Sequence, residues 1–353
     1  MIEIYRAYTF FILLSILVPN VASGVEPVRL LEAGKYTLNP HVEILEDRSN
    51  SLTIKDIIRP RYNEDFIGAK DAIINFGFTP YTYWLRFRLS YPGHPMNIRG
   101  IKTRYLEINR SALDVAELYT ATDNDAFDVI KSDLRMKFSE RDVNYVTSVF
   151  PINMRPGDDT EFYIKVRNSS TFAFSLILWD PREFLIKILR DELIYGAYFG
   201  ALLFLLIYNF FVWLSIRDVS YLYYVGYMVA VIWFQHLEVG HGTIHSGWVF
   251  EYFGKGFISQ SVWIATAFVI QFFRHFFMTD DKYPSSDVFL KILLCIIFIS
   301  IILDPFVSDV TSLLWVSIFS VMFLISLLLL SFTFFIRGDE NSRFFIFAWL
   351  FNI

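Results

Sequence analysis

The sequence predicts an all-β exported domain, a jelly roll or sandwich, followed by an α-helical transmembrane bundle. Three observations predict this fold class. The chain opens on a short apolar stretch of the kind that directs export. Residues 24–180 hold short alternating runs separated by turn-forming residues. Residues 193–353 hold long uncharged apolar stretches, in which the 38 Phe of the chain are concentrated.

The first 23 residues are typical of a signal peptide. Arg6 precedes the apolar run Ala7–Val18, which Pro19 interrupts before the small residues of "VASG". A run of this length is shorter than the ~20 residues that a membrane-spanning helix needs. We therefore predict a signal peptide at 1–23, with an uncleaved anchor as the alternative, and an exported segment after it.

Residues 24–180 are predicted to form an antiparallel β-sandwich or jelly roll. Short apolar or alternating runs are separated by "DRSN", "PGHP", "TDND", "RPGDD" and "NSS", which favour turns. The predicted strands lie in "HVEILED", "SLTIKDI", "YWLRFRLSY", "TRYLEI", "LDVAELYT", "NYVTSVFPI", "TEFYIKVRN" and "FAFSLILWD". No nucleophile motif or carboxylate pair stands out among them.

The stretch "PYTYWLRFRLSY", residues 80–91, alternates with a period of two, so it predicts one long strand with two different faces. The face predicted to enter the core consists of Tyr81, Tyr83, Leu85, Phe87 and Leu89. Trp84, Arg86 and Arg88 share the other face. Two interpretations stay open: Trp84 packs under a loop beside solvated arginines, or the three residues form a ligand site. An aromatic ring flanked by guanidinium groups suits a sugar or an anion.

The second half of the chain predicts a helical membrane bundle. Its first apolar stretch is long enough to cross a bilayer and carries no charge, and short connections make neighbouring helices antiparallel. The predicted spans are 193–214, 221–238, 257–277, 288–303, 311–336 and an incomplete sixth at 344–353.

The basic residues predict the orientation of the bundle. With the β domain outside, five Lys or Arg residues lie on the cytoplasmic side, and the outer loops hold only Lys255. The five are Arg217, Arg274, Lys282, Arg337 and Arg343. We therefore expect a multi-pass protein of a bacterial inner membrane with a periplasmic N-terminal domain.

Residues 181–192 are predicted to be an amphipathic juxtamembrane linker. Its apolar face is assigned to Phe184, Leu185, Ile188 and Leu189, and its basic residues Arg182, Lys187 and Arg190 lie elsewhere. Such a helix is expected to lie at the membrane surface and to link the β domain to the first span. Gly196 and Gly200, four residues apart in that span, predict close helix packing.

Polar residues near the outer end of the second span suggest an alternative function. His236, Glu238, His241 and His245 could hold a metal in a membrane enzyme, although only the last two His have a usual ligand spacing. The other interpretation is a water-exposed polar loop. The net charge of −5, without basic blocks, excludes a nucleic-acid partner. The only cysteine, Cys295, forms no intrachain disulfide, and we predict no cofactor.

The order of these parts resembles the bacterial seven-transmembrane receptors with diverse intracellular signalling modules, the 7TMR-DISM family. The exported half is similar to the second type of extracellular domain of that family through "VEILEDRSNSLTIKDI", "FGFTPYTYWLRFRL" and "LEINRSALDVAELY". The membrane half carries "YGAYFGALLFLLIYNFFVWLSIRDVSYLYYVGY", similar to the first two spans of the family, and "FFIFAWLFNI", similar to the start of its sixth. The matching elements of the first two spans are Tyr208, Asn209, Arg217, Asp218, Tyr221 and Leu222.

The resemblance implies a receptor without catalysis in these residues. Its periplasmic domain, similar to carbohydrate-binding modules, is expected to bind a small molecule or glycan. The bundle, through the matching residues of its first two spans, is expected to relay binding to a cytoplasmic signalling module. The chain ends within the sixth span, so we expect the gene to continue through a seventh span into that module. The oligomeric state stays open, with a homodimer among the alternatives.

Overall fold

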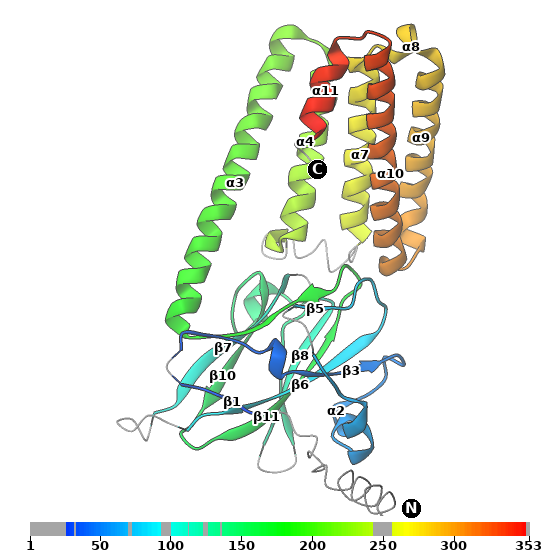
Figure 1. Ribbon diagram of the computed structural model, residues 1–353. Coiled ribbons are helices and arrows are strands. Elements are labelled where there is room, and N and C mark those ends of the chain that lie inside the picture. Colours follow the sequence, from blue (N-terminus) through cyan, green and yellow to red (C-terminus); the bar gives the residue numbers. More distant parts are fainter. Residues whose placement is uncertain are drawn as a thin grey trace, which may run out of the picture.

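The computed structural model describes residues 26–31, 33–69, 73–92, 100–111, 113–122, 126–134, 136–242 and 256–350. Figure 1 shows a β-sandwich at one end of a group of long helices. The predicted signal peptide, residues 1–23, lies outside the described residues. The predicted fold class, an all-β domain followed by a helical bundle, is confirmed.

The sandwich is built from short and medium strands, because turn formers interrupt the chain every few residues. Its strands are β1 (Val28–Arg29), β2 (Lys35–Thr37), β3 (Glu43–Asp47), β4 (Ile67–Gly68), β5 (Ile74–Asn75), β6 (Thr82–Ser90), β7 (Lys102–Ser111), β8 (Val115–Ala121), β9 (Phe127–Lys131), β10 (Thr147–Met154), β11 (Asp159–Arg167), β12 (Ala173–Phe174) and β13 (Leu176–Trp179). Short 3-10 helices occupy Asn39–His41 (η1), Pro60–Asp65 (η2) and Phe138–Glu140 (η3).

Two main sheets form the sandwich in the described part of the chain. The first runs in the order β4-β3-β6-β11-β8-β9, and β1 pairs parallel with the end of β6. The second runs in the order β10-β7-β13-β2, and the short strands β12 and β5 pair separately. Strands β6 and β7 therefore lie inside their sheets, with a partner strand on each side.

The main core lies between the two sheets, and β6 supplies the face that its alternation predicts. Tyr83, Leu85, Phe87 and Leu89 all belong to this core, which confirms the predicted core face of that strand. They pack there with residues of the opposite sheet such as Leu106. Since Phe87 is fully buried, its truncation to Ala is expected to cost about 3–5 kcal/mol.

The segment "SLTIKDI" is not a strand, which corrects the prediction. Ile54–Ile57 forms a short helix, α2, and η2 follows it. The reason is local: Thr53 and Asp56 form a capping box, in which each side chain satisfies the backbone N–H of the other. The alternation of apolar residues in this stretch therefore belongs to one turn of helix, which lies over the outer face of the first sheet.

The second half consists of helices whose bounds follow the apolar runs. They are α3 (Pro181–Ile216), α4 (Val219–Glu238), α7 (Gly256–Phe276), α8 (Thr279–Lys282), α9 (Pro284–Leu303), η4 (Asp304–Phe306), α10 (Asp309–Ile336) and α11 (Asn341–Leu350). Four described segments are long and apolar enough to cross a membrane: Pro181–Ile216, Gly256–Phe276, Pro284–Phe306 and Asp309–Ile336.

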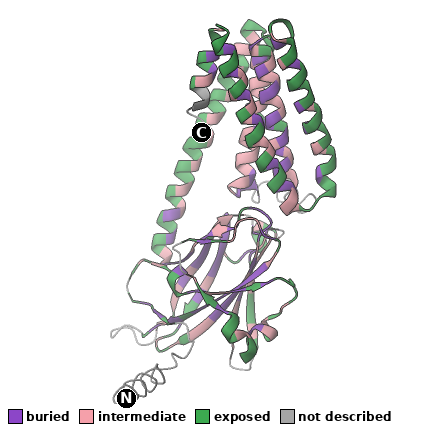
Figure 2. Ribbon diagram, turned by 45° about the vertical axis from the view of Figure 1, so that its right-hand side comes forward, coloured by how far each residue is buried: buried purple, intermediate pink, exposed green. Residues whose placement is uncertain are grey.

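Helix α3 stands apart from the other long helices. Figure 1 shows α4, α7, α9 and α10 side by side, whereas α3 diverges from α4 toward the sandwich. The most apolar 18-residue stretch of α3 is 0 % buried, against 50 % for α7. Figure 2 accordingly shows most of α3 as exposed, with buried positions close to the sandwich. This helix is the one continuous element that joins the two halves.

Candidate functional site

Trp84, predicted to line a ligand groove or to pack under a loop, is completely buried. Its ring belongs to a small apolar cluster on the outer face of the first sheet, with Leu45, Ile57, Phe66 and Tyr163. Helix α2 supplies Ile57 and η2 supplies Tyr62, and together they close this cluster. The ring therefore offers no exposed face on which a sugar can stack, and the packing interpretation describes its position.

Arg86 and Arg88 lie on the same face of β6 as Trp84 but have different surroundings. Arg86 is buried, donates to Glu43 Oε2 at 2.9 Å through Nε, and lies over the ring of Phe66 at 4.2 Å. Arg88 is half exposed and forms a two-pronged ion pair with Asp159 at 2.7 and 2.9 Å. The structure does not bring the three predicted residues to one open site, because a separate layer covers the first two.

A different part of the sandwich carries an open groove of about 840 Å³. It runs along β3 and the turn after it, beside η2, β4 and β5. Its lining combines aromatic, charged and amide groups: Tyr62, Phe76, Tyr83, Glu46, Arg48, Asp65 and Asn75. Such a mixture of apolar surface and a few polar groups is typical of small-molecule sites. Sequence reasoning missed this groove because its walls come from segments that are distant in the chain.

The walls of the groove are held by local hydrogen bonds. Asp47 accepts from the backbone N–H of Ser49 and of Leu52, at 3.0 Å each, which fixes the turn after β3. The ring of Tyr83 stacks on Phe76 with centroids 3.7 Å apart. The floor and one wall of the groove are therefore formed before any ligand arrives.

The junction between the sandwich and the membrane half begins at the first turn of α3. Asp180 caps this helix by accepting from the backbone N–H of Arg182 at 3.1 Å. The buried Arg104 of β7 pairs with Asp180 at 3.2 Å. Phe184, 2 % exposed, inserts among aromatic rings of the sandwich. The ring centroids of Tyr105 and Tyr145 lie 5.3 and 5.5 Å from its own.

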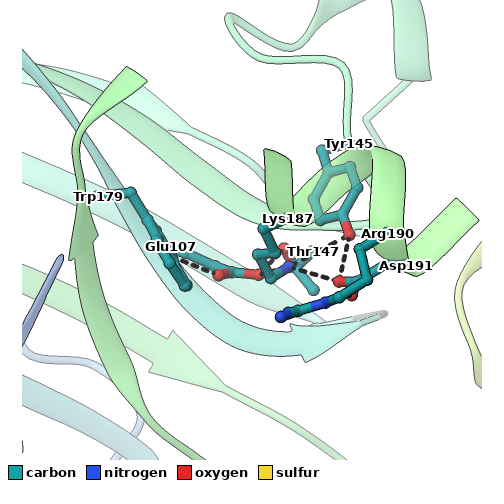
Figure 3. Close-up of polar contacts among 7 residues, drawn as sticks. All are labelled: Glu107, Tyr145, Thr147, Trp179, Lys187, Arg190 and Asp191. Atoms are coloured by element: carbon teal, nitrogen blue, oxygen red, sulfur yellow. Dashed lines mark hydrogen bonds and ion pairs between the residues drawn. The ribbon is translucent and has the colours of Figure 1, made fainter. Parts of the chain in front are cut away.

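One helical turn further, Lys187 of α3 enters the sandwich and meets a buried carboxylate (Figure 3). Its Nζ lies 2.8 Å from Glu107 Oε1, and the exposed fractions of the two side chains are 10 % and 0 %. Glu107 also accepts from the hydroxyl of Thr147 at 2.9 Å and from the indole N–H of Trp179 at 2.8 Å. Each oxygen of this buried carboxylate therefore has a donor, as a buried ion pair requires.

The same ammonium group is shared with two further side chains. Lys187 Nζ donates to the hydroxyl of Tyr145 at 3.2 Å and pairs with Asp191 at 3.2 Å. Burial alone lowers the pKa of Lys187, but the charge and hydrogen bond of Glu107 outweigh it and raise that pKa to about 12. Burial also raises the pKa of Tyr145 to about 12. Lys187 is therefore charged and Tyr145 neutral at physiological pH.

These contacts correct the expectation that residues 181–192 lie on the membrane surface. The segment is the start of α3 itself, and it docks on the sandwich through Phe184, Ile188 and Lys187. Leu185 and Leu189, assigned to the same face from the sequence, are 55 % and 63 % exposed. Adjacent residues in a helix point about 100° apart. Phe184 and Ile188 therefore reach the sandwich, whereas Leu185 and Leu189 point away from it.

A second contact joins the sandwich to α4. Arg110 of β7 pairs with Glu238 at 2.9 Å, and the hydroxyl of Ser111 donates to the Glu238 carbonyl at 2.8 Å. Gly240 follows with a φ of +94°, and a Cβ there would lie 2.8 Å from the Cβ of Ser111. Beside this contact, a cavity of about 710 Å³ extends among α3, α4, α7 and α10.

The residues of the predicted metal site do not converge on one point. Glu238 is directed to Arg110, whereas His236 and His241 stack as rings with centroids 6.1 Å apart. His245 lies outside the described residues. Within the described ranges, no three His, Cys, Asp or Glu side chains form a group able to hold a metal.

The predicted relay residues fall into two places. Arg217, in the left-handed conformation with φ of 60°, and Asp218 form the tight turn between α3 and α4. Asp218 caps α4, and the backbone N–H of Tyr221 donates to its carbonyl at 3.2 Å. Tyr208, 58 % exposed, and Asn209, which donates to the Leu205 carbonyl at 2.8 Å, lie along α3. Gly196 and Gly200 have no described atom of another element within 4 Å of a Cβ, so their predicted packing is not made here.

A β-sandwich attached through a buried junction to a long apolar helix, with further apolar helices behind it, is the architecture of a membrane protein with a folded domain outside the bilayer. Residues 39–180 match the family model described as 7TMR-DISM extracellular 2, and residues 191–353 match the model described as 7TM diverse intracellular signalling. The chain belongs to the 7TMR-DISM receptor family, which confirms the resemblance. No curated protein matches it.

Proposed function

We propose that the sandwich binds a ligand in the groove beside β3 and that α3 carries the resulting change to a cytoplasmic signalling module. The observation that carries this proposal is the junction at Lys187, where a membrane helix is locked into the exported domain by a buried ion pair. A shift of the second sheet moves Glu107, and through it the start of α3. Ligand binding alters the helices only if the ligand prefers one of two arrangements.

The proposed ligand is a small polyhydroxylated molecule, such as a sugar or short glycan. The groove offers the ring of Tyr62 at its wall and hydrogen-bonding groups of Glu46, Asp65 and Asn75 along its length. A sugar combines apolar ring faces with many hydroxyl groups, and this lining matches both features. Arg48, paired with Glu46 at 3.1 Å, supplies the cationic group of the lining.

The proposed location is a bacterial inner membrane with the sandwich in the periplasm. The distribution of Lys and Arg between the loops supports this orientation. The output is proposed to come from a cytoplasmic module rather than from a catalytic group in these residues. The arrangement of His236, Glu238 and His241 gives no support to the alternative of a metal enzyme.

The test is a binding screen of the full chain in lipid nanodiscs against mono- and oligosaccharides, with binding followed by calorimetry. Tyr62→Ala is expected to weaken affinity by about 5- to 150-fold, equivalent to about 1–3 kcal/mol for an aromatic anchor. Arg88→Ala, outside the groove, is the matched control and is expected to bind like the parent. Equal losses for both variants, or a screen without any binder, contradict the proposal.

A further inference from the structure

A short two-stranded ribbon connects the groove beside β3 with the ends of the membrane helices nearest the sandwich. The "ribbon" is defined here as residues 74–78, which contain β5, and residues 170–174, which contain β12. Within the described part of the chain, β5 and β12 pair with each other and with neither main sheet. Two further backbone hydrogen bonds join the segments, from Phe76 to the Phe172 carbonyl at 2.9 Å and from Phe172 to the Gly77 carbonyl at 2.8 Å. The two segments can therefore move together without breaking a ladder of either main sheet.

One end of the ribbon forms a wall of the groove. Ile74, Asn75 and Phe76 all line it. The ring of Phe76 contacts the rings of Tyr83 and Phe172, with centroids 3.7 and 5.2 Å from its own. Phe172 is fully buried, and close-packed interiors transmit displacements rather than absorb them. A molecule that presses on Phe76 therefore also displaces the second segment of the ribbon.

The other end of the ribbon contacts the helices from both segments. In the first segment, Phe78 packs against an apolar cluster to which the sandwich and three helices each contribute one buried residue. These residues are Leu134 of the sandwich, Leu237 of α4, Ile258 of α7 and Leu313 of α10. In the second segment, Ser170 accepts a hydrogen bond from Arg110 at 3.3 Å, and the same guanidinium nitrogen pairs with Glu238 of α4 at 2.9 Å.

We propose that the ribbon couples the groove directly to the ends of α4, α7 and α10, by a route that does not pass through α3. Phe76 at the groove and Phe78 at the helices are two residues apart, which is at most about 7 Å of extended chain. A ligand that prefers one position of the ribbon therefore shifts the helix contact. Because such coupling is reciprocal, a change in the helix contact must also alter the groove wall. The inference rests on the proposed ligand groove and adds a second connection to the one through α3.

The test is hydrogen exchange of the full chain in lipid nanodiscs, which measures without any ligand how the helix contact affects the groove wall. Leu237→Ala removes a fully buried side chain from the cluster against which Phe78 packs. We expect exchange of residues 74–78 and 170–174 to accelerate by about 5- to 150-fold, the usual size of coupling between two sites. Residues 67–69 line another wall of the groove, and their exchange should stay unchanged.

Leu327→Ala is the matched control for this variant. Leu327 of α10 is also fully buried, but it belongs to a cluster whose described members all come from the membrane half, so the ribbon should exchange as in the parent. Glu238→Gln leaves no cavity and weakens only the pair with Arg110, so it should accelerate residues 170–174 by a smaller factor.

Two outcomes overturn the coupling through the ribbon. One is equal acceleration of the ribbon by Leu237→Ala and Leu327→Ala, which indicates general destabilisation. The other is a ribbon that neither Leu237→Ala nor Glu238→Gln changes. A saccharide screen without a binder, together with the expected exchange, contradicts the proposed ligand but supports the coupling.

Discussion

Two of the ion pairs between the sandwich and the membrane helices, among the described residues, differ in burial. At α3, the side chains of Lys187 and Glu107 are 10 % and 0 % exposed, and further donors surround the pair. At α4, Arg110 and Glu238 are 22 % and 33 % exposed. Removing one partner of a buried pair costs about 3–5 kcal/mol, whereas exposed pairs contribute about 0–1 kcal/mol. The Lys187–Glu107 pair is therefore the stronger of the two ion pairs, whereas α4 is held mainly by apolar packing of Leu237 in a buried cluster with Leu134 of the sandwich.

This difference assigns separate roles to the two contacts. A ligand changes a conformational equilibrium only by its difference in affinity for two states, which is commonly a few kcal/mol. That amount exceeds the strength of the Arg110–Glu238 ion pair but not that of the Lys187–Glu107 pair. Under the proposed relay, a shift of the sandwich therefore carries α3 along and breaks the Arg110–Glu238 pair first. The following changes test this division.

The largest effect is expected for Lys187→Met. It leaves Glu107 charged, buried and without its cation, so we expect a loss of about 3–5 kcal/mol in the free energy of unfolding. Chemical unfolding of the full chain in detergent, followed by tryptophan fluorescence, measures this loss. The double variant Lys187→Met with Glu107→Leu removes both charges and is expected to recover much of the stability. If the double variant is as unstable as the single one, the pair is not the source of the effect.

Gly240→Ala tests the close approach at the α4 contact. The positive φ and the short distance to Ser111 both oppose a side chain there, and strained backbone of this kind costs about 1–3 kcal/mol. We expect the strain to be relieved by separation of α4 from the sandwich, with little loss of global stability. Hydrogen exchange of residues 236–242 should accelerate while that of residues 181–191 stays unchanged. Gly338→Ala is the control, because Gly338 also has a positive φ, of +87°, but a Cβ there meets no described atom.

Alkaline pH should weaken the α3 junction in a defined window. The pKa of Lys187 is raised from 10.5 to about 12, so its pairing stabilises the fold fully below pH 10.5. This contribution is lost as pH rises through the folded value, and the shift corresponds to about 2 kcal/mol. Unfolding free energies at pH 9 and pH 12 measure the loss. Lys187→Met should have a smaller dependence between these two values than the parent has.

The smallest effect is expected for Arg110→Ala. The pair with Glu238 is partly solvated, so stability should fall by less than about 1 kcal/mol. The effect of Arg110→Ala on signalling should be larger than its effect on stability, because the variant lacks the ion pair to Glu238 even when no ligand is bound. Charge reversal of both residues, Arg110→Glu with Glu238→Arg, is expected to restore the parent behaviour. If Arg110→Ala lowers the free energy of unfolding as much as Lys187→Met does, the two ion pairs do not differ in strength.

Sequence patterns alone predicted the structure correctly where one physical rule dominates. The core face of β6 follows from the period of two, and Leu85 and Phe87 are buried as predicted. The apolar helices follow from hydropathy, since a backbone in lipid must satisfy its own hydrogen bonds. The strand predicted at "SLTIKDI" was wrong because the capping box of Thr53 and Asp56, which starts α2, was not weighed against the alternation.

The remaining features depend on residues that are far apart in the chain. Trp84 is buried because α2 and η2 cover it, and the groove is lined by residues of β3, η2, β4 and β5 that lie far apart in the chain. Lys187 resembles any solvated lysine of an amphipathic helix until Glu107, eighty residues earlier, is placed beside it. A period of 3.6 also assigned Leu185 and Leu189 to the same apolar face as Phe184 and Ile188, since the pattern gives an apolar sector but not the direction of the partner.

Helix α3 runs for 36 residues without an interruption. At 1.5 Å per residue it is about 54 Å long, so rotating one end by a single degree displaces the other by about 0.9 Å. A rocking of the sandwich by five degrees thus becomes a displacement of about 5 Å at the Arg217 turn, roughly half the diameter of a helix. Because Arg217 and Asp218 alone separate α3 from α4, such a displacement of the end of α3 moves the start of α4 as well.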